Sequence, residues 1–474
     1  MPSPKASKRK SAPWPRVVCA GLIVAAIVVY IELMRRFPRL RPLTRSTGPI
    51  RIPVADPRLK VSAATDLWGD MIHLNHLNDA CVNGGDTVIP WSYNSSDTSY
   101  LWSRDMPTQH LIHLLAQCPE LDVFLPHDIR NHGYCQDSMA YIKYLRTRAL
   151  PLWVFDLTFD YQGRRNMSYF DLCPDTALLF LDEHSHGLPD RAIFPDDKKT
   201  VLLPNINSIA LSEAAYEQFD IVLCKTRDAY DRLSQWYRDM GNPRNTTILF
   251  VEHTSSDPAA MARAHANTRP AFPFIRPREI LGVRFLHVGE SPEAARSVVR
   301  CWLAQPELPA LDIYPLHPDV RAAVDQELRG AAPSNVHMHA PMDTPHLGRL
   351  LLEASAVLQP SRSEGFGHLI NQARAAGAVV VTTDGAPMNE LVDGDSGVLV
   401  PGTPAWADRH QLLSVYGSLE WGVTAGAVCA SVEHVVGLSP DQRRALGAAG
   451  RKRYENQLRA FRANMRRIRA LLRV

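Results

Sequence analysis

The chain alternates short apolar runs with amphipathic segments along most of its length, and this alternation restricts the folds open to it. Apolar-rich runs of four to six residues predict strands at 121–125, 177–181, 221–224, 284–289 and 378–383, and helical segments lie between them. Runs that are apolar throughout are typical of parallel strands covered by helices on both faces. The sequence therefore predicts an α/β protein, and 474 residues leave room for two or three domains.

Three other stretches complete the expected pattern. Residues 71–74 are predicted as the first strand, with Gly84-Gly85 in the loop beyond it, and residues 152–155 are predicted as a later strand. Residues 257–279 hold four prolines and are predicted to form an irregular linker between two α/β halves.

An apolar run at residues 17–34 lies between basic residues on both sides. Eighteen residues of helix extend about 27 Å, enough to cross a thin bilayer. A cleaved signal peptide is the alternative, but Arg35 and Arg36 follow the run and no small-x-small cleavage pattern does. The sequence favours a signal anchor, with residues 1–16 as a basic tail and residues 35–64 as an exposed stem.

The side of the membrane is harder to assign, because five Lys/Arg residues precede the span and five follow it closely. Tripeptide acceptors for N-glycans begin at Asn94, Asn166 and Asn245 and suit a body in the lumen. Seven of the eight cysteines lie outside the span, so at least one of them stays unpaired. No C-x-x-C pair is present, and a zinc site is not expected.

The segment 360–368, with the sequence PSRSEGFGH, carries the clearest functional signal. A predicted strand (356–358) leads into a carboxylate and two close glycines, and an amphipathic helix follows immediately. A glycine-lined helix N-terminus is a favourable place for a phosphate group. The carboxylate of Glu364 can accept hydrogen bonds from the hydroxyl groups of a sugar.

These residues resemble the nucleotide-sugar site of retaining GT-B glycosyltransferases, the family 4 or group 1 type with an E-x7-E motif. The resemblance covers about 190 residues of the second half, and it places Glu364 at the first Glu of the motif and Gln372 at the second. It implies that Glu364 contacts the transferred sugar and that Gln372 takes the place of a ribose-binding carboxylate. Donor-side contacts are then expected from Gly365, Phe366, Gly367 and His368.

The same resemblance implies further site residues. Gly289 ends the first strand of the second half, but Glu290 follows it where the family has a small or basic residue, so Arg296 is the candidate cation for the departing diphosphate. Gly84 and Gly85 correspond to a glycine loop of the first half. No histidine follows residues 152–155, and Asp156 is therefore the candidate acceptor-side group or base, with His127-Asp128 as a second possibility.

The resemblance also implies a GT-B fold with two Rossmann-like domains facing a cleft. The expected divisions are the tail (1–16), transmembrane anchor (17–34), stem (35–64), acceptor domain (65–256), linker (257–279), donor domain (280–439) and C-terminal helices that cross back (440–474). The D-x-D sequence at 393–395 lies in a polar turn, and no metal or cofactor is expected.

The leading hypothesis is a membrane-anchored glycosyltransferase, a hexosyltransferase-type enzyme that retains configuration without a metal. Its expected partners are a UDP- or GDP-sugar, a glycan, protein or lipid acceptor and the membrane, with a luminal body in the Golgi or endoplasmic reticulum. A net charge of +3, mainly at the two ends, gives no reason to expect nucleic acid. Alternatives are a degenerate GT-B protein that binds without turnover and a sugar-nucleotide epimerase.

Overall fold

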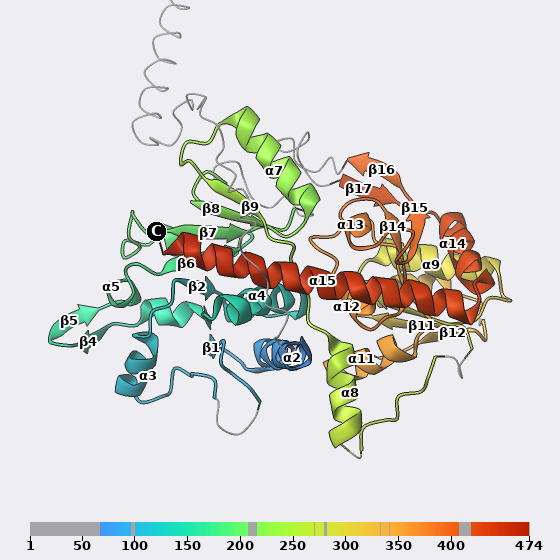
Figure 1. The fold of residues 1–474 in the computed structure, drawn as a ribbon, viewed down its shortest axis with the longest axis horizontal. Coiled ribbons are helices and arrows are strands. Elements are labelled where there is room, and N and C mark those ends of the chain that lie inside the picture. Colours follow the sequence, from blue (N-terminus) through green and yellow to red (C-terminus); the bar gives the residue numbers. More distant parts are fainter. Residues whose placement is uncertain are drawn as a thin grey trace, which may run out of the picture. The chain divides into compact units, whose positions relative to one another are not determined.

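Two mainly parallel β-sheets and the helices that cover them make up the fold (Figure 1). The computed structural model describes residues 67–95, 100–206, 216–269, 271–278, 282–331, 333–340, 342–406 and 419–473. The predicted tail, membrane span and stem lie outside these ranges. Within them, no helix has the length and apolar character that a membrane crossing requires.

The first lobe, defined as the elements from α2 to β9, is built around a seven-stranded sheet with the order β1-β3-β2-β6-β7-β8-β9. Strand β1 pairs antiparallel with β3, and the remaining pairs are parallel. The elements of this lobe are α2 (Leu67–Asn83), β1 (Ile89–Pro90), α3 (Thr108–Leu115), β2 (Leu121–Phe124), η2 (His127–Ile129), α4 (His132–Leu145), β3 (Arg148–Leu150), η3 (Leu152–Asp156), β4 (Phe159–Tyr161), β5 (Arg164–Met167), α5 (Tyr169–Leu172), β6 (Ala177–Leu181), η4 (Leu188–Asp190), β7 (Thr200–Leu203), β8 (Ile221–Cys224), α7 (Arg227–Met240) and β9 (Thr247–Phe250).

The second lobe, from β10 to α14, contains a six-stranded parallel sheet with the order β12-β11-β10-β13-β14-β15. This is the strand order of a dinucleotide-binding fold, in which ligands lie beyond the carboxyl ends of the two central strands, here β10 and β13. The elements are β10 (Arg284–Gly289), α9 (Pro292–Ala304), β11 (Ala310–Pro315), α10 (Pro318–Glu327), β12 (Val336–Met338), α11 (Thr344–Glu353), β13 (Ala356–Gln359), α12 (His368–Ala375), β14 (Val379–Asp384), α13 (Met388–Leu391), β15 (Val398–Pro401), β16 (Thr403–Trp406), β17 (Leu419–Gly422) and α14 (Ala425–Gly437).

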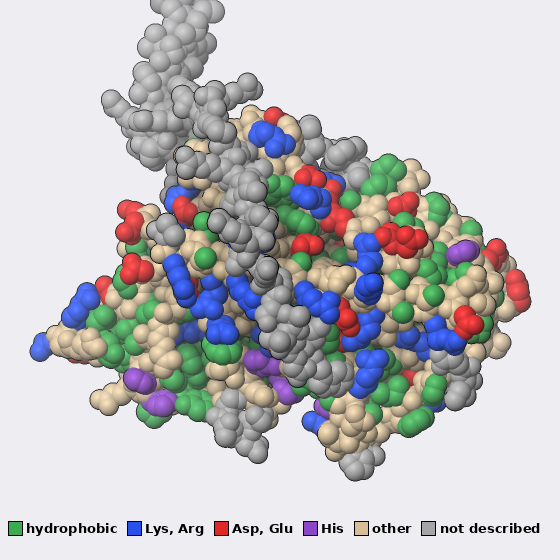
Figure 2. All heavy atoms as spheres, in the orientation of Figure 1, with side chains coloured by type: hydrophobic (Ala, Val, Ile, Leu, Met, Phe, Trp, Pro, Cys, Tyr) green, Lys and Arg blue, Asp and Glu red, His purple; other side chains and the backbone are tan. Residues whose placement is uncertain are grey.

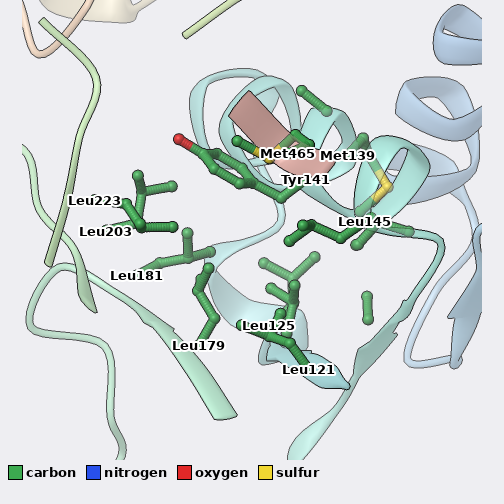
Figure 3. Close-up of a cluster of buried hydrophobic side chains, with 14 of the residues drawn as sticks. Leu121, Leu125, Met139, Tyr141, Leu145, Leu179, Leu181, Leu203, Leu223 and Met465 are labelled. Atoms are coloured by element: carbon green, nitrogen blue, oxygen red, sulfur yellow. The ribbon is translucent and has the colours of Figure 1, made fainter. Parts of the chain in front are cut away.

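The two sheets confirm the predicted α/β class and its parallel strands. Apolar side chains pack on both faces of each sheet, as runs without alternation require. Figure 3 shows one of these layers, in which Leu121, Leu179 and Leu203 of the first sheet face Tyr141 of α4.

Two predicted strands are wrong. Residues 71–74 lie within helix α2, where Met71, Leu74 and Leu77 are buried at a helical spacing, and the Asn75 amide donates to the Met71 carbonyl one turn earlier. Residues 152–155 form the 3₁₀ helix η3, because strand β3 ends at Leu150 and Pro151 has no N–H with which to continue a ladder.

The stretch predicted as an irregular linker also differs from expectation, because much of it is helix α8 (Pro258–Thr268). Asp257 caps this helix by accepting from the Ala260 N–H, and Pro258 takes the first helical position, where its missing N–H costs nothing. The helix packs closely on α11, since a Cβ at Gly348 would lie 1.9 Å from the Pro258 carbonyl oxygen.

A single helix, α15 (Pro440–Leu472), runs from the second lobe onto the first (Figure 1). Near its start it approaches the second lobe backbone to backbone, because a Cβ at Gly447 would lie 2.2 Å from the Gly377 carbonyl oxygen. Further along, Phe461 and Met465 are fully buried in the core of the first lobe.

Three disulfides join cysteines that are far apart in the sequence, and they include no C-x-x-C pair. They link Cys81 to Cys135, Cys118 to Cys173 and Cys301 to Cys429. Cys224 is buried and unpaired, which agrees with the expectation that one cysteine outside the span stays free.

The packing of α15 generates the first prediction. Phe461→Ala removes a fully buried ring from the first-lobe core and is expected to lower the free energy of unfolding by about 3–5 kcal/mol. Arg459→Ala, on the same helix but with a side chain 43% exposed, is the matched control and should change it by less than about 0.5 kcal/mol. Urea denaturation measures both, and equal losses would contradict the role given to α15.

Candidate active site between the two lobes

The loop after β13 brings Glu364 to the carboxyl end of the second sheet. Its carboxylate oxygen Oε1 accepts a hydrogen bond of 2.6 Å from the Ser361 hydroxyl. Helix α12 begins just after Gly367, whose φ of 97° favours glycine, and no side chain caps its first N–H groups. An acidic group and an uncapped helix N-terminus therefore lie within four residues of each other, as the sequence predicted.

A cleft of about 1080 Å³ opens near this loop: Leu369, which follows His368, lines the cleft, whereas residues 360–368 do not. Its first-lobe wall includes Gly84 and Asn131, and its second-lobe wall includes Glu290, His317 and Leu369. The cleft thus lies between the carboxyl ends of the two sheets, where an α/β fold binds its ligands.

Glu290 and Glu364 interact as like charges. Glu290 is reached by solvent from the cleft, but the surrounding walls remove much of its hydration. This burial and the negative charge of Glu364 raise the pKa of Glu290. Burial also raises the pKa of Glu364, against the Ser361 hydrogen bond and the positive charge of Lys225. Two carboxyl groups so placed hold a proton more readily than either would alone.

A buried polar network joins the two lobes next to Glu364. Asp137 of α4 accepts from Lys225 Nζ at 2.7 Å through Oδ2, and its Oδ1 lies 3.0 Å from His368 Nε2 and 3.2 Å from His253 Nε2. His368 belongs to the second lobe and the other three to the first, so its contact with Asp137 bridges the lobes. The Ser255 hydroxyl contacts the other ring nitrogen of His368 at 2.9 Å.

The charges of this network are balanced. Burial alone would raise the pKa of Asp137, but Lys225 and the two histidines hold it well below its usual range. Burial lowers the pKa of His253 to about 4, although Asp137 opposes this, so His253 is neutral near pH 7. Asp137, His253 and His368 also form a cluster that could hold a metal ion. The Lys225 ammonium group, which pairs with Asp137, already supplies the positive charge that a metal ion would bring.

Several predicted site residues lie elsewhere or in other roles. Arg296 is 3.9 Å from Glu293 and 3.8 Å from Glu327 of α10, and it is not part of the cleft wall. Asp156 pairs with Arg191 at 2.6 Å in a largely exposed position and does not follow a strand. Asp128, the second possibility, lies 3.4 Å from His186.

Three of the glycines that were predicted to contact the donor are Gly84, Gly85 and Gly289. Gly84 lines the cleft, but it follows helix α2 and not a strand, and a Cβ there would lie 2.3 Å from the Ala80 carbonyl oxygen. Gly85 takes a φ of 64°. Gly289 is needed for packing, because a Cβ would lie 2.7 Å from Val320. Close packing therefore accounts for Gly84 and Gly289 without a ligand.

Within α12, Gln372 is fully buried, and neither atom of its amide group has a hydrogen-bond partner. It does not line the cleft. His368, predicted to contact the donor, instead contacts Asp137, and Phe366 is buried edge-on against His253 with ring centroids 4.7 Å apart. Asp393 of the D-x-D turn bonds to Ser396 and pairs with Arg453.

Asp137, Lys225 and His253 are site residues that the sequence patterns did not single out. Lys225 directly follows the predicted strand 221–224, and His253 lies three residues after β9, at the edge where parallel sheets gather functional groups. This position was the signal that could have identified them. Asp137 gives no such signal, because it lies within a helix.

Two α/β lobes that meet at a cleft give the chain a GT-B-like fold. Residues 262–414 match the family model described as "Glycosyl transferases group 1". A curated relative, the D-inositol 3-phosphate glycosyltransferase of Arthrobacter sp. (strain FB24), is 40% identical over 78 residues, which are 16% of this chain and 18% of the relative.

Several solved structures align with this chain at low identity. Sucrose-phosphate synthase from Thermosynechococcus elongatus aligns with a TM-score of 0.47 and 18% identity over 69% of this chain and 83% of its own. The α,α-trehalose 6-phosphate synthase of Burkholderia multivorans aligns with a TM-score of 0.46 and 14% identity, over 63% and 71% of the two chains.

The carboxyl pair generates the second prediction. A carboxyl group whose pKa is raised in the folded state destabilises the fold as pH rises through that range, because the unfolded chain then binds fewer protons. Glu290→Gln removes this penalty. It is expected to raise the melting temperature at pH 8 relative to the wild type and to change it little at pH 4.

Glu293→Gln is the matched control, an exposed carboxylate three residues away, and should show no such pH-dependent gain. Melting curves of the three proteins at both pH values provide the measurement. A gain for Glu290→Gln of the same size at pH 4 and pH 8 would rule out the like-charge interaction.

Proposed function

We propose that the protein is a glycosyltransferase that moves a sugar from a nucleotide diphosphate sugar to an acceptor with retention of configuration. The single observation that carries this proposal is the position of Glu364. It lies at the carboxyl end of a dinucleotide-type sheet, beside an uncapped helix N-terminus, and its charge acts on Glu290, which lines the cleft shared by the two lobes. The match of residues 262–414 to the group 1 glycosyltransferase model supports it.

In the proposed arrangement, the nucleotide occupies the cleft and the diphosphate faces the first N–H groups of α12. Glu364 accepts hydrogen bonds from the transferred sugar. The leaving diphosphate and the incoming hydroxyl group then act on the same face of the sugar, without a covalent sugar–enzyme intermediate. Uridine or guanosine as the base, and a glycan, protein or lipid as the acceptor, remain the expected substrate classes.

The leaving group needs positive charge or hydrogen-bond donors, and Arg296 does not supply them because it faces α10. Glu290 can supply a hydrogen-bond donor when its carboxyl group is protonated. A carboxyl group with a raised pKa donates its proton to a phosphate oxygen, and the nearby Glu364 favours that protonated state. Lys225, which acts on the charge of Glu364, adds positive potential from the first lobe.

A non-catalytic protein that binds a sugar nucleotide is the second candidate. The observation that favours it is the pairing of Arg296 with Glu327, together with Gln372, whose amide is buried away from the cleft. Both predicted donor-side contacts are then lost. Turnover separates the two candidates, since binding alone is compatible with either.

The third prediction tests the transfer. Glu364→Gln keeps the shape of the side chain but weakens its hydrogen bonds to sugar hydroxyls, and it should lower the rate of donor hydrolysis or transfer about 10- to 100-fold. The affinity for the nucleotide alone should remain within a factor of about three of the wild type. Rates are measured with a panel of UDP- and GDP-sugars.

Glu307→Gln, an exposed carboxylate after α9, is the control and should keep full activity. Binding of a nucleotide by the wild type with no turnover of any donor would instead establish the non-catalytic candidate. A wild-type protein that binds none of the nucleotide sugars would contradict both candidate functions.

We also propose that the chain is a single-pass membrane protein whose body lies in the lumen of the Golgi or endoplasmic reticulum. The three disulfides support an oxidising compartment, because such bonds are rare in the cytosol. Asn166 and Asn245 of the glycan-acceptor tripeptides are exposed, which leaves room for an attached glycan. The anchor in this proposal is residues 17–34.

The fourth prediction concerns this topology. The full chain expressed in cells with an intact secretory pathway should run faster on a gel after treatment with an N-glycan endoglycosidase. The Asn166→Gln/Asn245→Gln double variant should show a smaller shift or none. A wild type with no shift, and with a body digested by protease added outside sealed microsomes, would place the body in the cytosol.

A further inference from the structure

A second cavity, of about 370 Å³, opens where α7, α13 and α15 meet. Lys225 and Glu252 line it from the first lobe, Arg374 and Glu390 from the second, and Arg453 from α15. It shares no lining residue with the larger cleft. In Figure 2, Lys and Arg side chains gather along the course of α15, to which Arg453 belongs.

Arg374 is the unusual member of this wall. Its side chain is 2% exposed, and it donates from Nη1 to the amide oxygens of Asn371 and Gln457, each at 2.9 Å. Its Nε is buried and has no partner. Burial, with some repulsion from Arg453, lowers the pKa of Arg374 to about 9, so the group is still charged near pH 7.

A buried cation held by neutral amides alone is expensive, because amide dipoles replace only part of its hydration. The other cations of the wall are neutralised. Lys225 pairs with Asp137, and Arg453 pairs with Asp393. Among the described residues of this wall, Arg374 is therefore the cation that forms no ion pair, although the charge of Asp393 acts on it from further away.

The first turn of α7 shows that this wall can bind negative charge. The N–H groups of Arg227 and Asp228 donate to the two carboxylate oxygens of Glu390, at 2.7 Å each. A helix N-terminus of this kind favours anions. Glu390 comes from the second lobe, and these two hydrogen bonds compensate part of its charge, although burial, together with Asp228 and Asp231, raises its pKa.

The remaining wall suits hydroxyl groups. Glu252 lines the cavity, and burial raises its pKa, although Arg227 and Arg467 oppose this. Asn456 of α15 adds an amide group, whereas both ends of the Gln457 amide are engaged by Arg374 and the His253 carbonyl. A ligand that is anionic at one end and hydroxylated at the other matches both parts of this wall.

We propose that this cavity binds a phosphorylated sugar, with its phosphate monoester on Arg374 and its hydroxyl groups toward Glu252 and α15. The binding itself does not depend on the transferase function. Lys225 lines the cavity and acts on the charge of Glu364, so the bound sugar phosphate lies near the transfer site. It is there either as the acceptor or as an effector.

The test uses the full chain and follows its melting temperature with glucose 6-phosphate, inorganic phosphate or glucose, each in the presence of excess UDP to occupy the larger cleft. Glucose 6-phosphate should raise the melting temperature, inorganic phosphate should do so only at higher concentration, and glucose should not. Arg374→Met should weaken binding of glucose 6-phosphate about 10- to 100-fold, the loss of a charge-assisted hydrogen bond.

Arg459→Met, an exposed arginine of α15, is the control and should bind like the wild type. Arg374→Met should keep the wild-type affinity for UDP, which separates a failure of this site from a failure of the donor site. If Arg374→Met does not fold, Arg374→Lys, which keeps the charge but loses Nε, should still bind glucose 6-phosphate more weakly than the wild type.

The proposal is overturned if glucose 6-phosphate and phosphate leave the wild type unchanged, or if the Arg374 variant that folds binds them as tightly as the wild type. An equal rise in melting temperature with phosphate and with glucose 6-phosphate would contradict the proposal that the cavity recognises the sugar. Transfer of a labelled sugar from a donor onto glucose 6-phosphate would identify an acceptor, and a changed rate without such a product would identify an effector.

Discussion

The site between the two lobes depends on one buried carboxylate, that of Asp137. It receives the ammonium group of Lys225 and contacts His253 and His368, so groups from both lobes meet at its two oxygen atoms. Removing Asp137 would leave Lys225 buried and unpaired, which costs more than the pair itself contributes. The same contact places the loop of Glu364 beside the first lobe, and the shape of the crevice follows from it.

Much of the fold could be predicted because parallel strands carry a strong local signal. Segments 177–181 and 221–224 are apolar throughout, and both are core strands. The failures share a cause. Residues 71–74 are also largely apolar, but Leu77 at helical spacing is buried too, as in a helix. Residues 152–155 follow Pro151, which cannot donate a hydrogen bond to continue the ladder of strand β3. Runs of four residues are too short to distinguish the period of a helix from that of a strand. In residues 257–279, four prolines suggested an irregular linker although Asp257 caps a helix there.

The candidate site was only partly accessible from the sequence. The Glu364 loop depends on consecutive residues, so its strand, turn and helix could be read directly. Arg296 was chosen for its nearness in sequence to Gly289, yet α9 turns it toward Glu327. Asp137 and His253 are 116 positions apart and meet only through tertiary packing. The packing of helices on sheets decides which charged groups of this kind become partners. Patterns in a single sequence carry no information about that packing.

Helix α15 has a mechanical consequence for the two lobes that it joins. Its start is seated through the Gly447–Gly377 backbone approach, which leaves almost no slack. Its far half is held by Phe461 and Met465 in the first-lobe core and by the ion pairs of Arg462 with Asp70 and of Arg469 with Glu120. The lobes therefore cannot move apart without breaking contacts at one end of this helix, and α15 works as a rigid brace that limits how far they open.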